Sequence, residues 1–193
     1  MAGKLNVLEI KKKLNDFSKE ELVELVAESV RISKDTRAYV LFRLEGEAGL
    51  LEWVAEAKAQ IDKEFNPTRG YPKLRPAIVK KTFTEINRLG KGTTWPLEIM
   101  IFFCETASAY IHDEGDIFEN MGDFFTDTFE KIIRLLNKEK SPDRFNSFQT
   151  RLETIVKKPN CHCWGIQDSL IGSYTELKWV DEDEFVKSLN VSS

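Results

Sequence analysis

The chain has little cysteine, glycine and proline. Its 193 residues include three Cys, 10 Gly and 6 Pro. A disulfide scaffold needs an even and denser set of cysteines, and a β-sandwich or barrel needs more turn residues. We therefore interpret Cys104, Cys161 and Cys163 as reduced thiols, and expect helices joined by short loops.

Long apolar runs are also missing. The longest, Ile99 to Cys104, is far too short to span a bilayer. The first thirteen residues alternate charge with Leu and Val and contain no apolar core of a signal peptide. A net charge of −4 gives no overall attraction to nucleic acid or to an anionic membrane. The sequence therefore predicts a soluble cytoplasmic protein, with no specific signal for nucleic acid, membrane or cofactor.

Periodic apolar positions and capping signals predict an all-α fold of about nine packed antiparallel helices, which could form a short curved helical array. A capping box at Ser18 and Glu21 opens one helix, Pro76 and Pro96 open two others, and Gly115 ends one. We expect a single domain over residues 1–178. Residues 179–193 are expected to form an acidic, partly frayed tail.

Charge is segregated along the chain. Residues 63–91 hold eight bases and two acids, whereas residues 92–130 hold nine acids and no Lys or Arg. Helical periodicity places one acidic set opposite the apolar side of its helix, which is typical of a solvated face. That set is Asp116, Glu119, Asp123, Asp127 and Glu130.

Residues 97–113 behave differently, because apolar side chains cover nearly the whole circumference of the predicted helix. Such a helix is normally buried on every side. Glu98, Glu105 and His112 are seven residues apart and form one narrow polar line along it. A buried carboxylate needs a partner, and Arg75, on the apolar side of its own helix, is the expected one. Two interpretations stay open: a structural Arg–Glu pair, or a ligand-binding pocket formed by Arg75, Glu98, Glu105 and His112.

Two weaker signals concern anions and metals. Arg69 and Lys73 precede a predicted helix N-terminus, where backbone N–H groups favour an anion, although a solvated basic loop explains them better. The run Cys161-His162-Cys163 offers metal-ligand types. Structural zinc usually needs four ligands in two spaced pairs, so no metal is expected there.

Several short motifs suggest a family. They are Lys63 to Phe65, Pro67, Arg69-Gly70, Pro72-Lys73, Arg75, Gly115 to Ile117 and Trp164-Gly165. Together these motifs resemble an uncharacterised bacterial family of all-helical proteins, a domain of unknown function. The likeness covers roughly residues 5–178. It implies a helical fold and brings no activity or catalytic residue with it.

No nucleophile, Walker-type loop or dinucleotide fingerprint stands out in the chain. The function predicted first is a non-enzymatic binding or interaction protein, whose ligand is a protein or a small anion. The alternative is an enzyme of unassigned class with a polar pocket around Arg75, Glu105 and His112.

Overall fold

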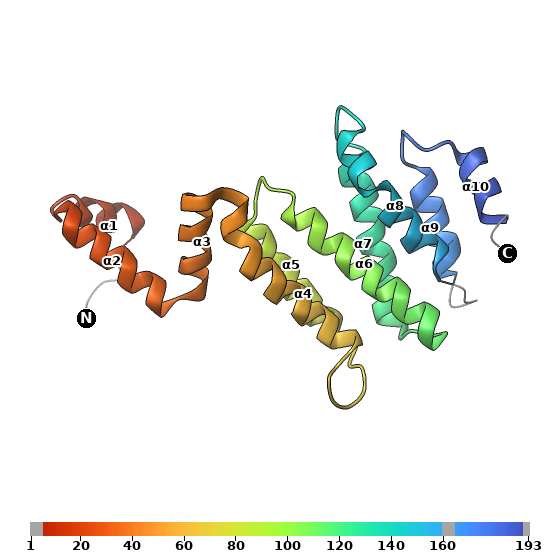
Figure 1. The fold of residues 1–193 in the computed structure, drawn as a ribbon, viewed down its shortest axis with the longest axis horizontal. Coiled ribbons are helices and arrows are strands. Elements are labelled where there is room, and N and C mark those ends of the chain that lie inside the picture. The colour runs from red at the N-terminus through yellow and green to blue at the C-terminus, as the bar shows by residue number, and fades with distance from the viewer. Residues whose placement is uncertain (1–5, 160–164, 191–193) are drawn as a thin grey trace. The chain divides into compact units, whose positions relative to one another are not determined.

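The computed structural model describes residues 6–159 and 165–190, and the regular secondary structure in those ranges consists of helices joined by loops (Figure 1). It contains ten α-helices and one short 3-10 helix, η1, and no strand in this part of the chain. The predicted all-α class is confirmed. The elements are α1 Val7–Leu14, α2 Lys19–Ile32, α3 Lys34–Glu45, η1 Gly46–Leu50, α4 Leu51–Phe65, α5 Pro76–Leu89, α6 Trp95–Glu114, α7 Glu119–Leu136, α8 Asp143–Lys157, α9 Ile166–Thr175 and α10 Glu182–Asn190.

The chain packs as two compact units, residues 1–53 and 54–193. No linker-like sequence marks the boundary between them, because α4 is continuous through it. Among the described residues, no helix is both long and apolar enough to cross a membrane.

The first unit has well-formed helix ends but a small core. Capping boxes close the N-termini of α1 and α2, with Asn6 and Ser18 as the cap residues. The buried residues described in this unit are only Ala38, Gly49 and Leu50. Gly49 lies so close to the Leu41 backbone that no larger side chain would fit between α3 and η1.

The larger unit is a series of helical hairpins arranged in two rows (Figure 1). In one row, α6 packs on α8, and the rings of Phe65 and Phe103 join α4 to α6. In the other row, α7 packs on both α5 and α9. The rows are joined by contacts of α5 with α6, α6 with α7 and α8 with α9. Successive hairpins thus repeat one packing relation, which is typical of helical-repeat folds.

Helix α6 is the centre of the core, as its all-round apolar pattern predicts. Ile99, Phe103 and Ala107 are each 0% exposed, whereas the predicted core residue Tyr110 is only half-buried. The ring of Phe103 lies 5.1 Å from Phe124 and 5.8 Å from Phe83, centroid to centroid. Neighbours on several sides, α5, α7 and α8, explain why α6 has no apolar-to-polar division of its surface.

Two predictions at the surface need comment. The acidic stripe of α7 is solvent-facing as expected, but Phe118, which was predicted to be on the apolar side, is 63% exposed. It is the N-cap residue of α7, outside the helical periodicity that buries Met121 and Phe125. Where the sequence suggested a partly frayed tail, residues 182–190 form α10, and Phe185 packs on Tyr174 at 4.5 Å between ring centroids.

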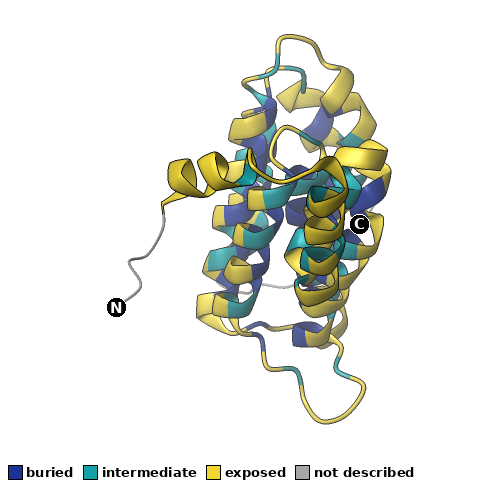
Figure 2. Cartoon of the chain, turned by 90° about the vertical axis from the view of Figure 1, so that its left-hand side faces the viewer, coloured by how far each residue is buried: buried dark blue, intermediate teal, exposed yellow. Residues whose placement is uncertain are grey.

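Figure 2 shows that buried residues lie on the sides of helices that face their neighbours. The helix beside the N-terminal trace, in contrast, is coloured exposed along nearly its whole length.

Candidate functional site

The polar line predicted on α6 is real, and α8 supplies its partners. Arg151 donates hydrogen bonds through Nε and Nη2 to Glu105 at 2.6 and 2.8 Å. The same guanidinium donates through Nη1 to Glu98 at 2.5 Å, and Lys58 of α4 donates to Glu98 at 2.8 Å. Four charged groups from three consecutive helices of one row therefore neutralise one another.

The line continues to the end of both helices. A hydrogen bond of 2.9 Å joins His112 Nδ1 and the carbonyl oxygen of Lys158, and Ser108 donates to the carbonyl oxygen of Ile155 at 3.0 Å. Glu105 and His112, seven residues apart on α6, thus meet Arg151 of α8 and Lys158 at its C-cap, which are also seven residues apart. We call these contacts the α6–α8 polar seam. It holds two parallel helices in register.

The electrostatics of the seam favour its ion-paired state. Burial raises the pKa of Glu98, but the hydrogen bonds from Arg151 and Lys58 outweigh it, so that the pKa is lowered. The pKa of Arg151 is raised, chiefly by its hydrogen bonds to Glu105. The carboxylate side chains are 15% and 30% exposed, and all their strong donors are in use. Glu98 and Arg151 are therefore both held in their charged forms near neutral pH.

The predicted pairing of Arg75 with Glu98 or Glu105 is wrong, because Arg75 binds Glu64. Its Nε and Nη2 donate to the Glu64 carboxylate at 2.9 and 2.6 Å, and its backbone N–H donates to the same group at 3.2 Å. Glu64 lies at the end of α4, only 4% exposed, and its carbonyl oxygen accepts the N–H groups of Lys73 and Leu74. The pKa of Glu64 is lowered, first by the Arg75 side-chain hydrogen bond, against the effect of burial.

This arrangement also accounts for the basic loop before α5. Three backbone N–H groups just before this helix are already bound to Glu64: Arg75 donates to its carboxylate, and Lys73 and Leu74 donate to its carbonyl oxygen. Arg69 and Lys73, the anion-binding candidates, are exposed on the loop. Arg75, Glu105 and His112 therefore belong to separate contacts: the first to the α4–α5 loop and the other two to the seam.

Arg151 was missed in the sequence, although the rule that selected Arg75 applies to it equally. It lies three residues after Phe148 and four before Ile155, on the apolar side of α8. Its guanidinium carbon stands 5.7 Å from the Phe148 ring centroid. What the sequence could not tell is which of two such arginines reaches α6.

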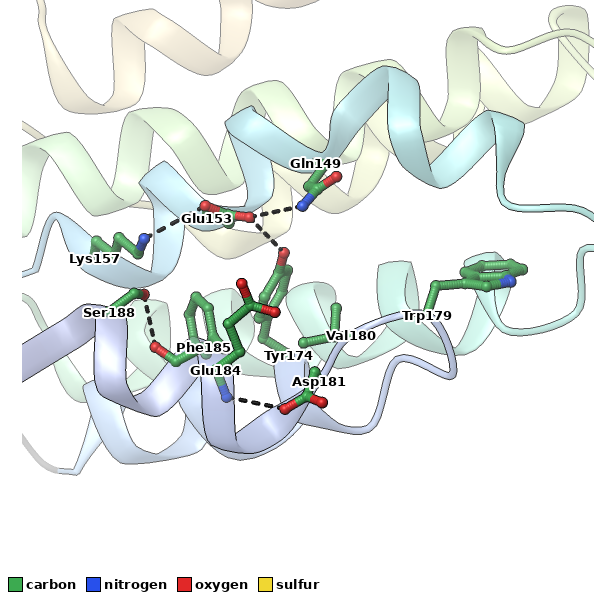
Figure 3. Close-up of a pocket in the computed structure, with 10 residues that line it drawn as sticks. All are labelled: Gln149, Glu153, Lys157, Tyr174, Trp179, Val180, Asp181, Glu184, Phe185 and Ser188. Carbon is green, nitrogen blue, oxygen red and sulfur yellow. Dashed lines mark hydrogen bonds and ion pairs between the residues drawn. The ribbon is translucent and has the colours of Figure 1, made fainter.

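A pocket of about 320 Å³ lies between α8, α9 and α10 (Figure 3). Glu153 sits in its wall and accepts hydrogen bonds from Gln149 at 3.0 Å and Tyr174 at 3.2 Å. Lys157 lies 3.4 Å from the other oxygen of Glu153, and over the Phe185 ring at 5.3 Å. Burial is the main cause that raises the pKa of Tyr174, and the negative charge of Glu153 raises it further. Glu153 and Lys157 thus pair with each other, and their contacts with Tyr174 and Phe185 hold α8 against α9 and α10.

A different arrangement occurs between α5 and α7, which we call the α5–α7 groove. Two depressions of about 320 and 370 Å³ share Asn87 and Lys131, so they lie next to each other, and we treat them together as one groove. Its apolar side chains come from α5, α6 and α7. They are Phe83, Leu97, Met100, Phe124, Leu135 and Leu136, together with Pro96.

The charged residues of the groove are mostly cations. Lys80, Lys91, Lys131 and Arg144 line it, against the two carboxylates Asp127 and Glu139. Arg144 is paired with Glu139 at 2.5 Å, and Lys80 lies over the Phe124 ring at 5.0 Å. Lys91 and Lys131 are exposed and make no ion pair with any described residue. In a chain of net charge −4, this is a local positive surface with an apolar floor.

Within the described residues, no group of three or more His, Cys, Asp or Glu could hold a metal ion. Cys161, His162 and Cys163 lie outside the described residues, and Cys104 is a buried free thiol in α6. Comparison with known proteins gave no match to a family model, to a curated protein or to a solved structure. The resemblance to a bacterial family of unknown function stays a prediction, and function has to be argued from the geometry.

Proposed function

We propose that this protein is a non-enzymatic binding protein that holds an acidic, amphipathic segment of a partner protein in the α5–α7 groove. The observation that carries the proposal is the combination of an apolar floor and lysines without carboxylate partners in one elongated groove. Apolar anchors of a ligand would pack on Phe83, Phe124 and Leu135. Its carboxylates would reach Lys80, Lys91 and Lys131.

The shape of the ligand follows from the groove. A small free anion would leave the apolar floor uncovered, whereas an amphipathic segment covers the floor and meets the lysines with one surface. The floor supplies affinity through burial of apolar area, and the lysines supply selectivity and speed of association. We place this activity in the bacterial cytoplasm, which the interpretation of the cysteines as reduced thiols and the family resemblance support.

The seam supports a binding role over the alternative of an enzyme. Glu98, Glu105 and Arg151 satisfy one another, and His112 is held by a backbone carbonyl, so the residues first considered for chemistry are used to dock helices. Arg75 is fixed to Glu64. No arrangement of these residues favours a particular reaction.

The test uses a fluorescein-labelled helical peptide of about four turns, with Leu and Phe along one face and Glu on both flanks. Fluorescence anisotropy with the full-length protein is expected to show saturable binding. Lys80→Glu combined with Lys131→Glu should weaken it by about tenfold or more, since each reversal places like charges together. Lys63→Glu, an exposed lysine at the far side of α4, is the matched control and should leave the affinity unchanged.

A second peptide with Lys in place of every Glu measures charge selectivity. The proposal fails if this basic peptide binds as well as the acidic one, if neither binds, or if the double variant keeps the affinity of the unmodified protein.

A further inference from the structure

The first two helices expose many apolar side chains, even though α2 packs on α3 in the same unit. No residue of α1 or α2 is buried. Val7 is 70% exposed, Leu8 64%, Val23 60% and Val26 46%. Ile10, Phe17, Leu25 and Ile32 are also exposed. The yellow colour of α1 in Figure 2 reflects this.

These exposed residues are not scattered. Val7 and Ile10 are three residues apart on α1, and Val23 and Val26 are three apart on α2, so exposed apolar side chains are neighbours on each helix. Helices of eight and fourteen residues are too short to be stable in water by propensity alone. Their stability therefore requires that another surface covers the apolar side.

Charge identifies the surface that fits. Residues 7–32 hold five bases and six acids, a net charge of −1, so an anionic membrane or a nucleic acid is not attracted. The charges are separated between the two helices. Helix α1 carries Lys11, Lys12 and Lys13, whereas α2 carries Glu20, Glu24 and Glu28 in one line, with Glu21 used in the capping box.

A surface with one basic and one acidic helix is complementary to itself when a second copy is turned by a two-fold axis. The basic α1 of each chain then lies beside the acidic α2 of the other, and the exposed apolar side chains meet between them. Such an isologous contact is the commonest way in which homodimers form. We infer that α1 and α2 dock on the same two helices of a second copy, giving a homodimer through a four-helix contact.

The direct measurement is the mass of the full-length protein in solution, by light scattering after size exclusion and by sedimentation. A dimer is expected at micromolar concentration. Val23→Glu combined with Val26→Glu should give a monomer with unchanged helical circular dichroism. The control is Phe118→Glu, which places a glutamate at an exposed apolar residue, the N-cap of α7, and should leave the dimer intact.

Charge reversal makes the test specific for a second copy. One variant carries Lys11→Glu, Lys12→Glu and Lys13→Glu, and the other carries Glu20→Lys, Glu24→Lys and Glu28→Lys. Each alone places like charges at both helix contacts and should dissociate at least about tenfold more readily. Mixed in equal amounts, they should form a heterodimer, because each basic helix then faces an acidic one. A monomeric unmodified protein, or a pair of variants that do not combine when mixed, would overturn the inference.

Discussion

Removal of the Arg151 side chain is the sharpest test of the α6–α8 polar seam. Its guanidinium makes four hydrogen bonds, two to Glu98 and two to Glu105. In Arg151→Ala, Glu98 keeps Lys58 as its partner, whereas Glu105 loses every side-chain partner that the structure gives it. The substitution therefore leaves a half-buried carboxylate unpaired between two packed helices.

The expected cost is intermediate between a surface pair and a buried pair. Breaking a fully buried ion pair costs about 3–5 kcal/mol, and exposed pairs contribute about 0–1 kcal/mol. Because the Arg151 and Glu105 side chains are 32% and 30% exposed, we expect roughly 2–3 kcal/mol for Arg151→Ala. Lys58→Ala should cost less, about 1 kcal/mol, since Arg151 still holds Glu98.

The assay is urea unfolding of the full-length protein followed by circular dichroism at 222 nm. With a slope of about 2 kcal/mol per molar urea, the midpoint should fall by about 1 M. Arg134→Ala is the matched control, because Arg134 pairs with Glu130 at 2.8 Å on the exposed side of α7, with side chains 63% and 44% exposed. Its cost should stay below about 0.5 kcal/mol.

The pH dependence gives a second readout of the same seam. The pKa of Glu98 is lowered in the folded state, so its contribution is complete above the unfolded value of 4.5 and is lost as pH falls through the folded value. The stability difference between the unmodified protein and Arg151→Ala should therefore be constant near neutral pH and shrink below about pH 4.5. If Arg151→Ala costs no more than Arg134→Ala, the seam does not hold the helices together.

Two further predictions concern the core. Phe103 is 0% exposed and has four aromatic neighbours, so Phe103→Ala should lower the free energy of unfolding by about 3–5 kcal/mol in the same urea assay. Phe118→Ala, at an exposed residue, should change it by less than about 1 kcal/mol. Burial raises the pKa of the Cys104 thiol, so this cysteine should react with a thiol reagent far more slowly in the folded protein than in urea. After unfolding, all three cysteines should titrate as free thiols. Fast labelling of Cys104 in the folded protein would contradict its position in α6.

Local sequence was enough to predict the helices and the most buried one. The residues that begin or end a helix act on neighbours only a few positions away in the chain. Examples are the N-cap residues Asn6 and Ser18, the prolines at helix starts, and Gly115 at a helix end. The apolar circumference of residues 97–113 predicted that α6 would be covered on several sides, whichever helices cover it. The polar line of Glu98, Glu105 and His112 likewise follows from the helical repeat alone.

The partners of that line were decided only by tertiary structure. Helical periodicity predicts both Arg75 and Arg151 on the apolar side of a helix, but Arg75 is the extended N-cap residue before α5, whereas Arg151 lies within α8. Packing places α8 beside α6, so Arg151 reaches Glu98 and Glu105 across 53 and 46 residues of sequence. Arg75 is instead captured by Glu64, eleven residues away, because the loop before α5 folds back on the end of α4.

The α5–α7 groove belongs to tertiary structure for the same reason. Lys80 is more than 40 residues away from Phe124 and Lys131 in the chain, and each alone resembles an ordinary surface or core residue. Helical periodicity fixes which face of its own helix each residue occupies. Only the packing of one helix row against the next determines which faces meet, because that depends on side-chain fit summed over many distant contacts.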